Sequence, residues 1–140
     1  MTGEPPIVEF DDRYAPEIKR IRNAVFTHEQ SIDEAIDFDG QDATAVHVLV
    51  RAGQGYVATG RMLSDGHIGR LAVLKEHRGQ GLGALAVCAL MDEAKRRSMR
   101  RVYLGSQKQA VGFYRKLGFC ECGEPVVEAG IEHVEMEKAV

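Results

Sequence analysis

The stretch LAVLKEHRGQGLGALAV, residues 71–87, passes from an apolar strand pattern through a glycine-rich loop into an apolar helical pattern. Gly79, Gly81 and Gly83 lie where the helix is expected to begin. Successive backbone N–H groups in such a turn point the same way, and a helix N-terminus adds unpaired donors and a partial positive charge. Glycine lets an anion approach this backbone closely. The stretch therefore predicts a binding site for a phosphate or pyrophosphate.

Two common glycine-rich nucleotide motifs do not account for this loop. The chain contains no GxxxxGK[ST] sequence, which argues against a P-loop nucleotidase. A dinucleotide-binding GxGxxG loop needs an acidic residue about 20 positions further on. This chain has Arg100 and Arg101 there. A tight strand-to-helix turn without a ligand is the alternative to an anion site.

On either side of the loop, the hydrophobic pattern predicts a mixture of strands and helices. The expected strands are residues 7–10, 45–50, 56–63, 68–74 and 102–106, followed by a closing hairpin after residue 119. The expected helices begin near Pro16, at the glycine-rich loop and at residue 107, and the last of them ends at Gly118. Residues 28–42 are expected to form a long loop with at most a short helix. The pattern predicts an α/β fold.

Length and composition describe one globular domain covering residues 1–140. The chain has 140 residues, of which 44% are hydrophobic and 28% charged. No apolar run approaches the ~20 residues that cross a bilayer, so a membrane protein is not expected. The opening MTGEPPIVEF lacks a basic region followed by an apolar stretch, which predicts a protein without a signal peptide and a cytoplasmic location.

Charge is sorted along the chain. Residues 51–118 hold 13 Lys and Arg against 4 Asp and Glu, whereas residues 1–50 and 119–140 are both acidic. Charge balance within the folded protein and a small polyanionic ligand are both compatible with this pattern. The formal net charge of −3 and the acidic ends argue against a nucleic-acid partner.

The cysteine and histidine residues give no metal-binding pattern. Cys88, Cys120 and Cys122 form no CxxC pair, and the histidines make no HxH or HxxxH pair. We therefore expect no bound metal and three buried thiols. In the helix after the glycine-rich loop, the expected apolar face comprises Leu85, Cys88, Ala89 and residues 91–94.

Two motifs carry a resemblance to a known family. The first motif is RGQGLG (residues 78–83), which follows the strand ending in LAVL and resembles the acetyl-CoA loop of the GNAT (Gcn5-related N-acetyltransferase) superfamily. The second is QKQAVGFYRKLGF (residues 107–119), which resembles a helix of the same superfamily. The flanking VFTHEQSIDEAIDFDGQDATAVH and EAGIEH are similar to its small bacterial ElaA/YjcF-type branch. The resemblance implies a mostly antiparallel sheet of about six or seven strands with a splayed central pair, flanked by about three or four helices.

The resemblance implies that acetyl-CoA is the co-substrate. In the family, the strand matching residues 68–74 carries a bulge and splays from the strand matching residues 102–106, which admits pantetheine between them. Backbone groups of Leu71 and Val73 would bind it like an added strand, and the N–H of Leu71 or a neighbour would stabilise the oxyanion. The residues implied to contact acetyl-CoA are Leu71, Ala72, Val73, Arg78, Gly79, Gln80, Gly81, Leu82, Gly83, Gln107, Tyr114 and Lys116. Gln107 departs from the Asn that is usual in the family.

The same resemblance suggests how the reaction would be catalysed. The family tyrosine that matches Tyr114 lies beside the coenzyme A sulfur, which makes Tyr114 the expected acid. A core role is the alternative, because Ala110, Tyr114 and Leu117 form an apolar stripe. Many relatives carry a glutamate base at or near Gly69, but this strand holds no carboxylate. Glu29 is the leading substitute, ahead of His67, His47 and a water relay.

The expected acceptor-site residues are Arg22, Glu29, Glu128 and His133. Arg22 shares a helical face with Ile18 and Val25, so a structural ion pair is favoured over recognition of an acidic acceptor. Glu128 and His133 would close one side of the cleft or cap the hairpin. The acidic ends of the chain suggest a cationic acceptor, either a small-molecule amine or a lysine side chain.

Taken together, the residues and the resemblance predict an N-acetyltransferase in which the amine attacks acetyl-CoA directly in a ternary complex. No covalent intermediate is expected, because the chain contains no GxSxG elbow. The alternative is a protein of the same fold that binds acyl-CoA as a sensor with little catalysis. The sequence leaves open whether the chain forms a homodimer.

Overall fold

Eight strands form two four-stranded sheets in the computed structural model, which describes residues 5–128 and 130–140. The first sheet consists of antiparallel neighbours in chain order: β1 (Ile7–Val8), β2 (Val46–Ala52), β3 (Gly55–Met62) and β4 (Ile68–Val73). In the second sheet, β8 (Ile131–Ala139) lies between β5 (Arg101–Gln107) and β6 (Cys120–Glu121) and also pairs with β7 (Val126–Glu128). The first four residues of the opening MTGEPPIVEF lie outside the described residues.

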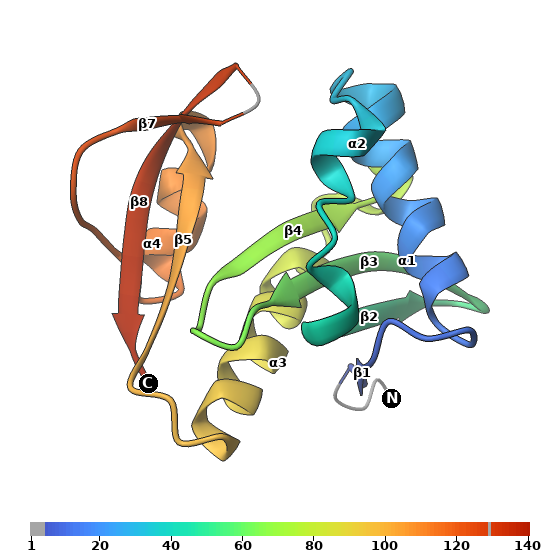
Figure 1. Ribbon diagram of the computed structural model, residues 1–140, viewed down its shortest axis with the longest axis horizontal. Coiled ribbons are helices and arrows are strands. Elements are labelled where there is room, and N and C mark those ends of the chain that lie inside the picture. Colours follow the sequence, from blue (N-terminus) through green and yellow to red (C-terminus); the bar gives the residue numbers. More distant parts are fainter. Residues whose placement is uncertain (1–4, 129) are drawn as a thin grey trace.

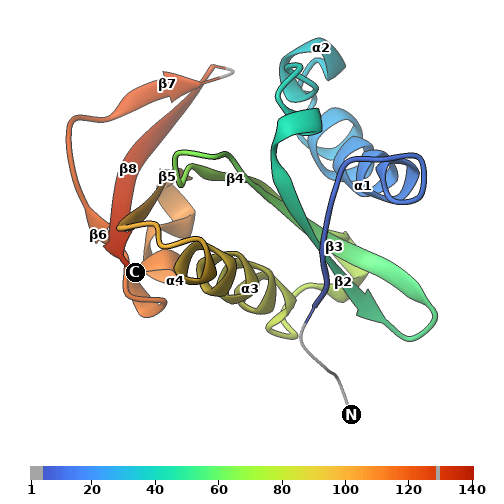
Figure 2. The ribbon, with the colours of Figure 1, turned by 60° about the horizontal axis from the view of Figure 1, so that its bottom comes forward.

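Helices cover both faces of the first sheet and one face of the second (Figures 1 and 2). On the first sheet, α1 (Ala15–Arg22) packs on one face and α3 (Leu82–Arg96) on the other, and α4 (Val111–Lys116) covers the second sheet. A π-helical segment, Asn23–Glu29, prolongs α1, and the short α2 (Glu34–Asp37) follows it. Turns of 3₁₀ helix occupy residues 42–44, 75–77 and 108–110.

The central strands of the first sheet bury side chains on both sides because both faces are covered. On β2, Val48 and Val50 pack toward α3, whereas Leu49 between them packs against Ile18 and Ile21 of α1. Successive side chains of a strand point to opposite faces, so this alternation divides the interior into two clusters. The two clusters hold α1 and α3 firmly against the sheet.

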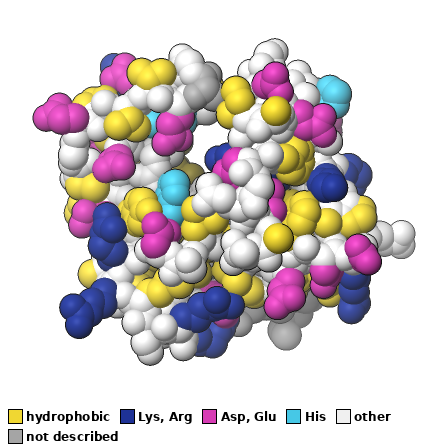
Figure 3. Space-filling view, viewed as in Figure 1, with side chains coloured by type: hydrophobic (Ala, Val, Ile, Leu, Met, Phe, Trp, Pro, Cys, Tyr) yellow, Lys and Arg dark blue, Asp and Glu magenta, His cyan; other side chains and the backbone are white. Residues whose placement is uncertain are grey.

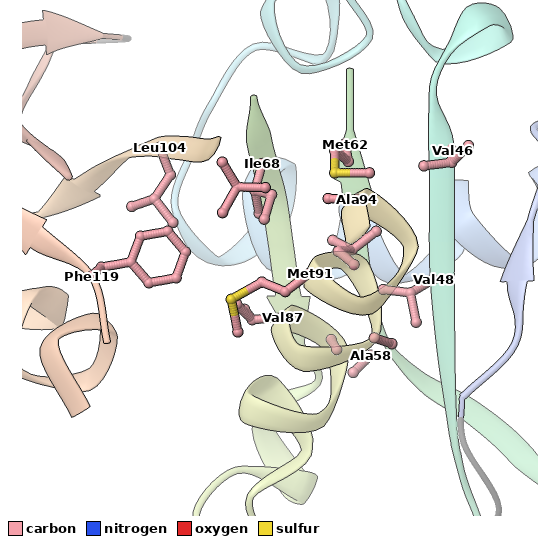
Figure 4. Packing of buried hydrophobic residues seen from close by; sticks show 14 of the residues in the cluster. Val46, Val48, Ala58, Met62, Ile68, Val87, Met91, Ala94, Leu104 and Phe119 are labelled. Atoms are coloured by element: carbon pink, nitrogen blue, oxygen red, sulfur yellow. The ribbon is translucent and has the colours of Figure 1, made fainter. Parts of the chain in front are cut away.

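The larger hydrophobic cluster joins the two sheets through α3. Val87 and Met91 of α3 belong to the same cluster as Ile68 of β4 and Leu104 and Phe119 from the second sheet. Figure 4 shows Met91 extending from the helix toward the second sheet. This cluster therefore extends from the first sheet to the second.

The buried face of α3 differs from the one expected from the sequence. Its buried residues are Ala86, Val87, Ala89, Leu90, Met91 and Ala94. Leu85 and Cys88 are exposed, so their assignment to the apolar face was wrong. The expectation of three buried thiols was also wrong, since Cys120 is exposed and Cys122 half-buried. Alanines are compatible with either side of a helix, and the neighbouring sheet decides which side is buried.

Strands β4 and β5 touch at one end and then diverge. Their contact is a parallel bridge between His67 and Tyr103, and the Tyr103 N–H donates a 3.0 Å hydrogen bond to the Gly66 carbonyl oxygen. A Cβ on Gly66 would lie 2.5 Å from the Arg101 carbonyl oxygen, so the close approach needs glycine here. Further along, β4 pairs with β3, whereas β5 pairs with β8 of the second sheet. This confirms the splayed pair.

The remaining predictions of local structure are partly confirmed. The stretch expected as a long loop, residues 28–42, contains the end of the π-helical segment and α2. The helix expected from residue 107 is shorter, because β5 continues to Gln107 and a 3₁₀ turn precedes α4. Within residues 5–128 and 130–140, no helix is long and apolar enough to cross a membrane.

Candidate active site

A cavity of about 830 Å³ occupies the space between the diverging strands β4 and β5. Its walls also include the glycine-rich loop, α4, residues near α2 and the β7–β8 hairpin. Figure 3 shows the molecule hollowed between the part that carries β7 and the part that carries α2. The splay of the two sheets therefore creates a site large enough for a small molecule or cofactor.

The glycine-rich loop forms one end of this cavity. Gly79 and Gly81 adopt φ angles of +79° and +80°, and no atom of the described residues lies within 4 Å of where their Cβ atoms would be. Gly81 is the N-cap of α3 and supplies no side-chain cap, so the first N–H groups of the helix are available to a ligand. Such an arrangement favours a bound anion. Leu82 and Gly83 also line the cavity.

Arg78, at the start of the loop, is held by two partners. Its Nη1 and Nη2 donate to the Glu29 carboxylate at 2.6 and 2.7 Å, and its Nε donates to the Val73 carbonyl oxygen at 3.0 Å. These hydrogen bonds lower the pKa of Glu29. The pair joins the end of the π-helical segment to the loop. Glu29 is therefore a weak base in this conformation, and it does not belong to the cavity lining.

The floor of the cavity contains a β-bulge in β4. Arg70 and Leu71 together face Gly60 of β3, since Gly69 pairs with Arg61 and Ala72 pairs with Thr59. Arg70 has a φ of +52°, which non-glycine residues rarely adopt. The bulge turns the backbone at Leu71 toward the splay, and Leu71, Ala72 and Val73 all line the cavity.

Tyr114 of α4 lies in the opposite wall of the cavity, near the glycine-rich loop. Burial alone raises the pKa of its hydroxyl to about 12. The ring packs edge-on against Phe113 and Phe119, at centroid distances of 4.9 and 5.8 Å. At neutral pH this hydroxyl keeps its proton and can donate it. Tyr114 thus also contributes to the hydrophobic core, as its apolar stripe indicated.

Arg22 lies beneath the cavity rather than in it. Its side chain is fully buried, its Nη1 donates to Asp42 at 2.7 Å, and its Nε and Nη2 donate to Asp37 at 3.2 and 3.1 Å. Burial acts to raise the pKa of Asp42, but the hydrogen bond and charge of Arg22 lower it. The prediction that Arg22 contacts the substrate was wrong, because its N–H groups are hydrogen-bonded to Asp37 and Asp42 and are inaccessible. The structural ion pair is the observed arrangement.

Two further arginines extend this ion network to the cavity, and the sequence analysis missed both. Arg61 of β3 donates to Asp39 and Asp42, and Arg70 of the bulge donates to Asp39 at 3.1 Å and to the carbonyl oxygens of Asp37 and Ile36. Arg70 thereby ties the bulge to α2. The sequence feature that could have drawn attention to these two arginines is a Gly-Arg pair that occurs twice, at residues 60–61 and at residues 69–70.

The histidines considered as bases lie in different places. His47 is fully buried, outside the cavity lining. His67 lines the cavity at its closed end, where it stacks on Tyr103 with ring centroids 4.7 Å apart. Burial lowers the pKa of His67. Strand β4 itself therefore carries no side chain at the bulge that could serve as the base.

Glu128 and His133 do line the cavity, on the β7–β8 hairpin. Both side chains lie against Gly105 of β5: a Cβ there would be 3.5 Å from the His133 Cβ and 3.6 Å from a Glu128 carboxylate oxygen. Of the other expected residues, Gln107 lines the cavity and contacts Gln30 at 3.4 Å. Gln80 and Lys116 are exposed outside the lining.

A family model described as an acetyltransferase (GNAT) domain matches residues 13–140 of the chain. The protein belongs to the GNAT acetyltransferase family. Family membership makes it an acyltransferase. Two proteins of Bacillus subtilis are similar to it over most of their length: YyaT is 37% identical over 89% of this chain and 88% of its own, and the N-acetyltransferase YjcF is 34% identical over 84% and 87%.

Solved structures of GNAT proteins have the same fold. Escherichia coli ElaA is 27% identical and superposes with a TM-score of 0.86 over 97% of this chain and 99% of its own. An aminoglycoside 6′-N-acetyltransferase complexed with coenzyme A is 16% identical, with a TM-score of 0.75 over 96% of both chains. The resemblance to the GNAT superfamily and its ElaA/YjcF-type branch is thus confirmed.

The residues of this GNAT site fit coenzyme A. The open backbone at Gly79 and Gly81 and the uncapped start of α3 suit a pyrophosphate, and Arg78 adds a cation beside them. The diverging inner edges of β4 and β5 leave room for an extended amide-bearing arm. Among the described residues, no group of three or more His, Cys, Asp or Glu side chains could hold a metal ion.

Proposed function

We propose that this GNAT protein transfers the acetyl group of acetyl-CoA to a primary amine, by direct attack of the amine in a ternary complex. Tyr114 carries the proposal, because it lines the cavity and its hydroxyl has a pKa of about 12. A group that is protonated at neutral pH and buried beside the binding space can protonate a departing thiolate. The need for intracellular acetyl-CoA makes a cytoplasmic location part of the proposal.

Each wall of the cavity has a role in this reaction. Bound acetyl-CoA supplies an acetyl group activated as a thioester. The pyrophosphate nest at Gly79–Gly83 and Arg78 would bind and orient the donor, and the backbone of Leu71 and Val73 would hold its amides. The bulge N–H at Leu71 would donate to the carbonyl oxygen where negative charge develops. Tyr114 would give its proton to sulfur as the C–S bond breaks.

The lining on the acceptor side supports an amine with an apolar body. Phe26, Ile32, Ile36, Leu63 and Ile131 contribute apolar surface to the cavity, and Glu128 adds a carboxylate. An arylalkylamine or a lysine side chain combines an apolar portion with an ammonium group, and both fit this lining. Both acceptors match the class expected from the sequence.

The test is release of thiol from acetyl-CoA with 2-phenylethylamine, spermidine, hydroxylamine and a lysine-containing peptide. Loss of the Tyr114 hydroxyl in Tyr114→Phe should lower kcat about 100-fold or more with the best of these amines. The matched control is Tyr56→Phe, which removes a hydroxyl from β3 outside the cavity. Equal rates for Tyr114→Phe and the wild-type protein would remove Tyr114 as the acid.

Binding of the donor is tested separately by thermal unfolding. Coenzyme A at 100 times its Kd should add about 2.7 kcal/mol to the free energy of unfolding, which raises Tm by several degrees. An unchanged Tm at saturating coenzyme A contradicts the proposal. Stabilisation by coenzyme A without thiol release from any amine of the panel would favour the acyl-CoA sensor.

A further inference from the structure

Two glycines lie at the same level in the β4 and β5 walls of the cavity. Gly69 lies two residues beyond His67 on β4, and Gly105 lies two residues beyond Tyr103 on β5. Because His67 and Tyr103 form a parallel bridge and each residue of a strand advances about 3.3 Å, Gly69 and Gly105 are level with each other. In residues 5–128 and 130–140, no atom lies within 4 Å of where a Gly69 side chain would begin.

The side chains beside Gly105 come from the β7–β8 hairpin. His133 is the β8 partner of Gln107, and its Cβ would contact a methyl group on Gly105 at 3.5 Å. The two carboxylate oxygens of Glu128 lie 3.6 and 3.8 Å from the same point. The side chain of His133 and the carboxylate of Glu128 therefore lie beside the same point of the cavity wall, next to Gly105.

The hydrogen bond of His133 defines which of its ring nitrogens is basic. Nδ1 lies 2.8 Å from the carbonyl oxygen of Ile131, and a carbonyl oxygen can only accept a hydrogen bond. Nδ1 therefore carries the proton, and in the neutral ring Nε2 has a free lone pair. His133 lines the cavity, and no hydrogen bond to Nε2 is formed by the described residues.

Other carboxylates in the cavity wall are neutralised by arginine. Asp37 is paired with Arg22, and Asp39 is paired with Arg61 and Arg70. Glu128 forms no ion pair with any residue that the structure describes. A protonated amine entering the cavity would thus find its free counter-charge at Glu128, next to His133.

We propose that His133 is the general base that deprotonates the acceptor ammonium, while Glu128 binds that ammonium beside it. This inference rests on the proposed function. One N–H bond of the ammonium breaks and its proton passes to Nε2 of His133. The freed lone pair forms the C–N bond, the C–S bond breaks, and sulfur takes the Tyr114 proton. The second proton lost by nitrogen returns to the Tyr114 oxygen, and His133 releases its proton to solvent.

Two amines of different basicity separate this role from a structural one. 2-Phenylethylamine is a cation at pH 7 and has to lose a proton before it attacks. Hydroxylamine is largely neutral at the same pH and does not. The informative variant is His133→Asn, because the Asn amide can donate to the Ile131 carbonyl oxygen as Nδ1 does but cannot act as a base.

His133→Asn should lower kcat/KM about 100-fold with 2-phenylethylamine, or with spermidine if that is the faster substrate, and leave the hydroxylamine rate within about threefold. Glu128→Gln should raise KM for the cationic amine about tenfold and leave KM for hydroxylamine unchanged. Glu132→Gln is the matched control, since Glu132 points to the other side of β8. His28→Asn, on the exposed end of the π-helical segment, controls for loss of a histidine.

Equal losses with both amines would show that His133 only supports the hairpin, and an unchanged rate with the cationic amine would exclude it as the base. Either result leaves the proposed function intact, provided that the wild-type protein turns over. No thiol release by the wild-type protein with any amine overturns the proposed function and this inference with it. A Tm of His133→Asn close to that of the wild-type protein shows that the hairpin is intact.

Discussion

Glu29 and Arg78, 49 residues apart in the chain, form a two-pronged ion pair in which both terminal guanidinium nitrogens contact the carboxylate. The arginine belongs to the loop that we propose for pyrophosphate binding. Before a ligand arrives, its charge is thus neutralised by a carboxylate from the first helix. Coenzyme A would compete with Glu29 for this guanidinium.

Glu29→Gln should therefore strengthen coenzyme A binding. The Gln amide removes the competing charge but keeps a similar shape. The pair is more than one-third exposed, so we expect a gain of only about threefold in affinity. Titration calorimetry at low ionic strength measures it. Glu17→Gln, which disrupts the exposed pair with Arg20 on the same helix, should leave the affinity unchanged. Weaker binding by Glu29→Gln would mean that the ion pair instead keeps the loop in the conformation that binds coenzyme A.

Gly81→Ala should weaken coenzyme A binding as well as destabilise the fold. A Cβ at Gly81 meets open space, so the cost comes from the φ of +80°, about 1–2 kcal/mol for an L-residue. Relaxation of this strain would move the N–H groups at the start of α3, and we expect at least a tenfold loss of affinity. The comparison is with Gly53→Ala in the β2–β3 turn, which also has a positive φ and open space. We expect the two variants to lose similar amounts of Tm. Only Gly81→Ala should bind coenzyme A more weakly. Equal affinities would contradict the proposed nest.

Arg22→Met should destabilise the protein severely. It leaves Asp37 and Asp42 in the interior with less compensating charge, and loss of one member of a buried ion pair costs about 3–5 kcal/mol. Urea unfolding measures the change. Arg20→Met, which removes an exposed arginine from the same helix, should cost less than about 1 kcal/mol. A similar cost for both variants would show that the buried network contributes little.

Stability should fall as the pH is lowered through the histidine range. Burial lowers the pKa of His47, whose Nδ1 has no hydrogen-bond partner among the described residues, and burial also lowers the pKa of His67. Below about pH 6.5 the unfolded chain therefore binds more protons than the native protein, so acid favours unfolding. Above that pH, the contribution of these two histidines to the free energy of unfolding is complete.

His47→Gln is expected to reduce this pH dependence. The Gln amide can replace the Nε2 contact with the Asp42 carbonyl oxygen, but it does not titrate. Urea unfolding at pH 7.5 and pH 5 should show a smaller difference for the variant than for the wild-type protein, with the remaining dependence due in part to His67. An unchanged difference would assign the acid sensitivity to other groups.

The sequence predicted those parts of the site that arise from contiguous residues. The loop at Gly79–Gly83 and the start of α3 follow from local backbone chemistry, and the position of Tyr114 follows from its motif. The Glu29–Arg78 pair could not be predicted, because its partners come from distant elements. The same is true of the ion network: the acidic N-terminal segment and the basic middle of the chain meet only when α2 packs beside β3 and β4.

Which face of α3 is buried could not be predicted from the sequence, for a different reason. Leu85 and Cys88 are apolar, and Ala86 and Ala94 are compatible with either face, so several orientations satisfy the pattern. The first sheet selects the orientation through contacts with Val48, Ala58 and Ile68, which the helix sequence alone does not contain. Tertiary packing thus decides what local periodicity leaves open.

The divergence of β4 and β5 leaves each strand with one edge whose backbone groups are not paired with a neighbouring strand beyond the bridge at His67. An open strand edge on a protein surface is a template for pairing with other chains and hence for aggregation. Here the two edges face each other across a cavity rather than facing outward. The protein can therefore keep unpaired backbone donors and acceptors for a ligand while denying them to a second protein molecule.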